Sequence, residues 1–281
     1  MRRLRALSDA ATYPDRGEVR FLRGDLGTAC DAMRLVHKLE ALAATVVGHE
    51  GYEYLVTTAA TFPDWSRPLQ NVDGLDKCFA IAVVGRYLLY RHAGRFLRPG
   101  ARVLNVLASG ERLPVHLFDR AVAAGERNSS HLFENMMTFA VGNEAMLDVV
   151  LEEYNYAAEE DARDAFTLVS THPGALKTDL HRGQGWWFDV LEAIMVTLVG
   201  RTEEDAGVHQ SSVLVSDRLR RGSLTFVDSF GRGRVRDPQL EATLEENQDW
   251  LRRLLARTEA AAEGCDGDRR RNVPSVAVTP A

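Results

Sequence analysis

The chain has 281 residues, 45% of them hydrophobic and 26% charged, which suits one large α/β domain. Its 34 basic and 40 acidic side chains are dispersed along the chain and give a formal net charge of -6, which argues against nucleic acid or an acidic membrane surface as a partner. We expect one domain over residues 1–258 and a polar, disordered tail over 259–281.

The three cysteines, Cys30, Cys78 and Cys265, are far apart and none belongs to a CxxC pair. The spacing therefore indicates neither a disulfide framework nor a zinc site, and no metal site is predicted. This pattern fits a reducing, cytoplasmic compartment. The basic N-terminus lacks the apolar core of a signal peptide, and the apolar stretch 190–200 is too short to span a membrane and carries Glu192.

Strand-like and helix-like patterns alternate along the chain. Strands are indicated by short apolar or β-branched runs bounded by turn residues, and helices by apolar residues three and four positions apart. In chain order the predicted elements are strand 18–22, helix 29–46, strand 52–60, helix 73–97, strand 101–108, helix 132–158, strand 165–171, helix 201–217, strand 223–228 and helix 238–258.

This alternation predicts a parallel sheet with helices on both faces, because parallel strands need a crossover of helical length. The run at 101–108 is apolar enough to be a central strand covered on both sides. In open α/β sheets ligands bind beyond the carboxyl ends of the strands. Candidate site residues are therefore sought at those ends.

Several short motifs stand at these strand ends in a particular order. Asp25-Leu26 follows the first strand, LVTTAA (55–60) ends the second, VLNVLASG (103–110) covers the third, and HPGALKTDL (172–180) follows the fourth. From about residue 18 to 230 this order resembles the short-chain dehydrogenase/reductase family. It is similar in particular to fungal members of secondary metabolism with a comparable Pro-Gly loop.

The resemblance implies a Rossmann-type α/β fold, a three-layer parallel sheet that is N-terminally incomplete here, and NADP or NAD as the cofactor. It places an acidic residue near the adenine, small residues after the next strand, and the Pro-Gly loop on the nicotinamide side. The cofactor-binding residues implied in this way are Asp25, Leu26, Thr58, Ala59, Pro173, Gly174 and Thr178.

The sequence departs from the family where the acid/base groups are expected. Family members carry a Tyr and a Lys four residues apart on the long helix, and the register from the Pro-Gly loop puts Phe139 and Asn143 there. Phenylalanine has no exchangeable proton and asparagine carries no charge, so that relay cannot operate. The substrate-holding serine falls at Ala108 or, with a one-residue slip, at Ser109, and the supporting helix asparagine falls at Ala82.

The glycine-rich phosphate turn of the family has no counterpart, because no GxxxGxG occurs in the sequence. The Gly/Arg cluster at 231–234 is interpreted as a surface turn. Without the first two family strands the sheet would carry a gap of roughly 10 Å. Three solutions stay open: residues 18–23 move beside 53–58, another chain fills the space, or the chain is a truncated form.

Other polar groups could take over the missing proton transfer. His131 and Glu134 stand one turn apart at the start of the long helix, as an acid/base pair or as an ordinary solvated first turn. His172, Asp179 and His181 could converge near the pocket, or make only loop hydrogen bonds.

The predicted function is an oxidoreductase that acts on a small hydrophobic metabolite, in a tailoring step of secondary-metabolite biosynthesis. The candidate catalytic residues are Ser109, His131 and Asn143, and the aromatic run 186–188 could line an apolar pocket or simply pack in a helix. The alternatives are a non-redox isomerase or cyclase, and an inactive partner subunit. A homodimer is a further expectation.

Overall fold

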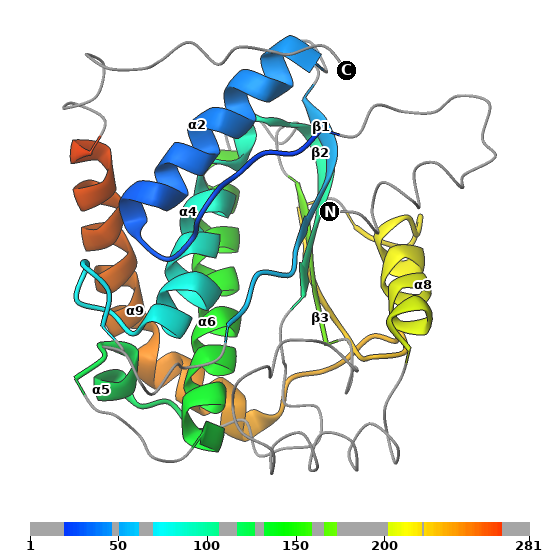
Figure 1. Ribbon diagram of the computed structural model, residues 1–281. Coiled ribbons are helices and arrows are strands. Elements are labelled where there is room, and N and C mark those ends of the chain that lie inside the picture. The colour runs from blue at the N-terminus through cyan, green and yellow to red at the C-terminus, as the bar shows by residue number, and fades with distance from the viewer. Residues whose placement is uncertain are drawn as a thin grey trace.

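The computed structural model describes residues 20–46, 51–61, 70–106, 117–126, 132–158, 166–172, 202–220 and 222–265. In this part of the chain a parallel sheet lies between two helical layers, with α2, α4, α6 and α9 on one face and α8 on the other (Figure 1). This three-layer arrangement confirms the expected Rossmann-type α/β fold.

The strands are β1 (Tyr52–Thr57), β2 (Leu97–Val106), β3 (Thr167–Thr171) and β4 (Leu224–Val227). The helices before α6 are α2 (Ala29–Val46), α3 (Lys77–Phe79), the π-helix η2 (Ala80–Val84), α4 (Gly85–Arg91), the 3-10 helix η3 (Ala93–Arg95) and α5 (Arg120–Ala123). The later helices are α6 (Leu132–Ala158), α8 (Glu203–Leu214) and α9 (Pro238–Gly264).

The sheet has the order β1-β2-β3-β4, and every neighbouring pair is parallel. Leu104 of β2 stands between Val56 of β1 and Val169 of β3, so the strands end at a common edge. All five residues of β3 are buried, as expected of a strand covered on both faces. The four strands predicted after residue 50 are thereby confirmed.

The two faces of the sheet receive different side chains because successive residues of a strand point to opposite sides. Leu104 and Val169 face α8, where they form a small apolar cluster with Val213 and Leu214. Val103 and Leu168 face the other side and belong to the main core under α4, α6 and α9. Polar residues of that second face, described below, lie near the carboxyl ends.

The strand predicted at 18–22 is wrong for the residues that the structure describes. Arg20 to Leu22 have no strand conformation and their side chains are exposed. The segment runs along α2 (Figure 1), where Lys38 donates to the Arg23 carbonyl and Gly24 lies against Leu35. An alternating pattern makes a strand only if a neighbour pairs with it, and here the neighbour is a helix.

Two predicted helices differ in detail. The helix expected at 73–97 begins at Lys77, where Asp76 caps it by accepting from the N–H groups of Cys78 and Phe79, and its middle is the π-helix η2. The last helix, expected to end with the domain at residue 258, continues to Gly264 because its buried stripe includes Thr258 and Ala262.

The prediction of unpaired cysteines is also wrong, because Cys30 and Cys265 form a disulfide and Cys78 is free and buried. Their sequence separation of 235 hides the contact, which exists only because α2 and α9 pack together. The inference of a reducing compartment rested on unpaired cysteines and loses that support. None of the described helices is both long and apolar enough to cross a membrane.

Candidate functional site

The carboxyl ends of β1 and β2 and the start of α4 form one continuous edge. Thr58 and Ala59 directly follow β1 and are exposed. The Ala59 carbonyl accepts from the Arg86 guanidinium at 2.7 Å, while the neighbouring Gly85 lies against Leu26. The Asp25-Leu26 turn and the end of β1 therefore meet at adjacent residues of α4, as the motif order predicts.

Within the Asp25-Leu26 turn the two residues face different surroundings. Asp25 is exposed and its Oδ1 accepts the Gly27 N–H at 2.8 Å, which fixes the turn. Leu26 is buried, and Gly85 permits its close approach because a Cβ there would overlap the Leu26 carbonyl oxygen. Asn71 donates to the Gly27 carbonyl at 2.8 Å and anchors the turn to the chain before α3. Asp25 is thus positioned toward solvent, and Leu26 is a packing residue.

A polar network lies directly beneath this edge, and the sequence analysis missed its centre. The Arg86 side chain has no exposed surface and donates to Asn105 Oδ1 at 2.6 Å as well as to Ala59. The Tyr90 hydroxyl donates to the same Asn105 oxygen at 2.8 Å and also bonds Thr57. The sequence carries one signal of this network, because Arg86 is the charged residue inside the apolar run FAIAVVGRYLLY.

Burial sets the electrostatics of this network. Desolvation lowers the pKa of Arg86, and the nearby Tyr90 acts in the opposite direction. Desolvation likewise raises the pKa of Tyr90, with the Arg86 cation opposing it. The tyrosine is therefore neutral at pH 7, and its contacts tie β1 to β2 without exchanging a proton.

Asn143, the residue at the family's lysine position, belongs to the same network. It is 1% exposed, its Oδ1 accepts from Asn105 Nδ2 at 2.8 Å, and its Nδ2 donates to the Ala82 carbonyl at 2.6 Å. Ala82 lies in the π-helix η2, and a π-helical turn departs from the regular hydrogen-bonding pattern of an α-helix. Both ends of the Asn143 amide are thus bonded to protein beneath the edge.

Phe139, at the family's tyrosine position, is buried against the core. Its ring centroid lies 6.4 Å from that of Phe79. A ring packed there fills space between α6 and α3 and has no group that could exchange a proton. Phe139 and Asn143 therefore have structural roles at the two α6 positions where short-chain dehydrogenase/reductases carry their tyrosine and lysine.

Comparison with known proteins places this geometry in a fold. No family model and no curated protein matches the sequence. The angucycline C-6 ketoreductase LanV, solved with bound NADP, is 17% identical at a TM-score of 0.50, over 76% of this chain and 75% of its own. An uncharacterised protein from Mycobacterium paratuberculosis is 16% identical at a TM-score of 0.52, over 93% of this chain and 81% of its own.

The chain has a Rossmann-type fold that it shares with LanV. A short-chain dehydrogenase/reductase from Serratia marcescens also matches, at 18% identity and a TM-score of 0.49, over 82% of this chain and 84% of that one. At these identities the structural similarity to LanV and to the mycobacterial protein shows the fold alone.

A second polar cluster lies where the chain after β4 returns toward α6. Arg234 pairs with Glu144 at 2.5 Å, and Arg236 pairs with Asp148 at 2.7 Å. Both guanidinium groups also lie over the Phe226 ring. The surface-turn interpretation of 231–234 fits the exposed Arg232 and fails for Arg234, because its partner comes from α6, far away in sequence.

His172 is the one described member of its predicted trio. Burial lowers its pKa to about 4, and the Arg234 cation acts in the same direction, so the imidazole is neutral at pH 7. Several other predicted site residues lie outside the described residues, and their roles stay predictions: Ser109, His131, Pro173, Gly174, Thr178, Asp179, His181 and the run 186–188. The same holds for the side chain of Glu134.

Proposed function

We propose that this chain is an oxidoreductase that binds NADP or NAD along the carboxyl edge and acts there on a small hydrophobic metabolite. The observation that carries the proposal is the convergence of Asp25, Thr58 and Ala59 on the start of α4, at the edge where this fold class binds ligands. LanV, which shares the fold, was solved with NADP. A tailoring step in secondary metabolism is part of the proposal.

The residues present fit the adenosine end of such a cofactor. Asp25 offers an exposed carboxylate that can accept hydrogen bonds from an amino group, and Thr58 and Ala59 are small enough for close approach of a ligand. The described residues contain no glycine-rich turn for the pyrophosphate. When bound, the nicotinamide would supply or accept the hydride.

The chain's own contribution is positioning. Arg86 holds the Ala59 carbonyl from below, and Asn105 joins that cation to Asn143, so the ends of β1 and β2 are fixed relative to α6. Fixed placement of reactants is a recognised source of rate. The described part of α6 offers no proton at its two family positions, so we assign proton transfer to Ser109, His131 or water.

One observation favours a second candidate, an inactive partner subunit. The Asn143 amide is saturated by protein contacts and Phe139 is packed in the core. A protein that no longer exchanges protons needs these positions only for stability. The two candidates differ in turnover and agree on the fold.

A fluorescence titration with NADPH and NADH tests the proposal. The wild-type chain should bind one of them with micromolar affinity, and Thr58→Trp should weaken binding by at least about tenfold, because an indole would occupy the edge. Val208→Trp is the matched control, since Val208 is exposed on α8, away from this edge. If the folded protein binds neither dinucleotide, or if both variants bind like wild type, the proposal fails.

A further inference from the structure

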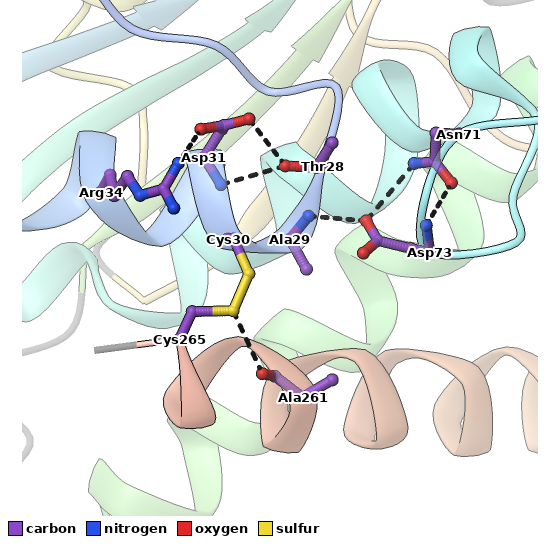
Figure 2. Close-up of a disulfide and its surroundings, with 9 residues drawn as sticks. All are labelled: Thr28, Ala29, Cys30, Asp31, Arg34, Asn71, Asp73, Ala261 and Cys265. Atoms are coloured by element: carbon purple, nitrogen blue, oxygen red, sulfur yellow. Dashed lines mark hydrogen bonds and ion pairs between the residues drawn. A yellow bond between two sulfur atoms is a disulfide. The ribbon is translucent and has the colours of Figure 1, made fainter. Parts of the chain in front are cut away.

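The Cys30–Cys265 disulfide joins the two ends of the described chain. Cys30 lies in the first turn of α2 and Cys265 directly follows α9, with 5.8 Å between their Cα atoms (Figure 2). Both residues are partly exposed, so a small dithiol can reach the bond. The third cysteine, Cys78, is buried.

The α2 end of this bond belongs to the segment that carries the candidate site. Segment 25–30 runs from the exposed carboxylate of the Asp-Leu turn into α2. It is held by two further bonds at 2.8 Å, from the Ala29 N–H to the Asp73 carboxylate and from Asn71 to the Gly27 carbonyl. Figure 2 shows Ala29, Asp73 and the disulfide side by side. A displacement of the first helical turn of α2 would therefore also displace the Asp25-Leu26 turn.

The α9 end has little else to hold it. Glu259 is the last residue of α9 with long-range polar contacts, to Tyr87, Arg91 and His92. Between Glu259 and Gly264 only Ala262 is buried. Helix ends fray when few apolar contacts hold them, so the disulfide is the main tie on the last turn.

We propose that the Cys30–Cys265 disulfide is a redox latch that holds segment 25–30 in its binding position, and that its reduction loosens this segment and weakens dinucleotide binding. This inference deepens the proposed function and rests on it for the binding step. The mechanical step, loosening of α2 and α9, stands independently.

The chemistry is thiol–disulfide exchange with a dithiol reductant. One thiolate of the reductant attacks one sulfur of the bridge, the bridge S–S bond breaks, and a mixed disulfide forms. The second thiol of the reductant then displaces the protein sulfur. Two electrons and two protons pass from the dithiol to Cys30 and Cys265, which end as thiols, while the reductant ends as its own disulfide.

Hydrogen–deuterium exchange on the full chain, with and without dithiothreitol, tests the latch, and intact mass confirms the redox state. Reduction should speed exchange in 26–31 and 260–265 and leave β3 unchanged. Cys265→Ser should exchange like reduced wild type and ignore the reductant, which separates bond cleavage from side effects. Over the same series the NADPH dissociation constant should rise roughly three- to tenfold, because ordering a loose segment then opposes binding.

The outcomes separate the latch from the proposed function. Unchanged exchange in 26–31 after verified reduction, or absence of the disulfide in oxidised protein, overturns the latch. Faster exchange with equal NADPH affinity in both states overturns its control of binding. Faster exchange in a protein that binds no dinucleotide in either state refutes the proposed function and leaves the mechanical latch supported.

Discussion

Replacing Asn143 by leucine tests whether this position is a structural joint. The side chain is fully enclosed and bonds Asn105 Nδ2 at 2.8 Å and the Ala82 carbonyl at 2.6 Å. Leucine has a similar shape, so little cavity arises, but both partners lose a hydrogen bond in the core. Asn105 Nδ2 keeps only a long contact of 3.4 Å to Ser170.

Each buried group left unpaired costs about 1–3 kcal/mol, and apolar burial of the leucine offsets part of the sum. We therefore expect the free energy of unfolding in urea to fall by about 2–4 kcal/mol. Gln239→Leu, at an exposed amide in the first turn of α9, is the control and should stay within about 0.5 kcal/mol. A loss in Asn143→Leu no larger than in this control would refute the network.

Three further predictions concern stability and thiol reactivity. Arg236→Ala should cost about 1.5–3 kcal/mol in urea, because the partly buried Asp148 carboxylate loses both hydrogen bonds from Arg236 while Glu144 keeps its pair with Arg234. Arg252→Ala removes an exposed pair and should cost at most about 1 kcal/mol, and equal losses in the two variants would contradict this reasoning. Gly85→Ala should lower the thermal midpoint through a loss of about 1–3 kcal/mol, because its methyl group overlaps the Leu26 carbonyl, and an unchanged midpoint would count against that contact. Burial raises the pKa of the Cys78 thiol to about 12, so an aromatic disulfide reagent should find no reactive thiol in the native oxidised protein and one after unfolding; three without reductant would exclude the disulfide.

The elements that were predicted correctly are those whose formation depends on residues close together in the sequence. The helices at 29–46 and 132–158 were predicted to the residue, because their apolar spacing persists from end to end. The four parallel strands followed from apolar runs bounded by turns. The strand at 18–22 failed because a strand also depends on a neighbour that its own sequence does not contain.

Contacts between distant segments lay beyond such patterns. Cys30 and Cys265 are 235 residues apart, and nothing in their spacing reveals that α2 and α9 pack together. The partner of Arg234 is likewise on another element, so a surface turn was the natural interpretation. Asp25, Thr58 and Ala59 were predicted to share one edge, and they lie beside adjacent residues of α4, while their part in cofactor binding stays a prediction. The polar network beneath this edge, centred on Arg86, was not predicted from the sequence and was found only in the structure.

Deuterium transfer from NADPH deuterated at both C4 positions to a panel of aromatic and alicyclic ketones, followed by mass spectrometry, tests the proposed hydride transfer. We expect an alcohol that carries deuterium on the former carbonyl carbon, formed by wild type and formed more slowly by Thr58→Trp when NADPH is below its dissociation constant. Folded protein that binds NADPH but transfers no deuterium to any ketone, under conditions where an active ketoreductase does, would contradict the oxidoreductase and favour the inactive partner subunit.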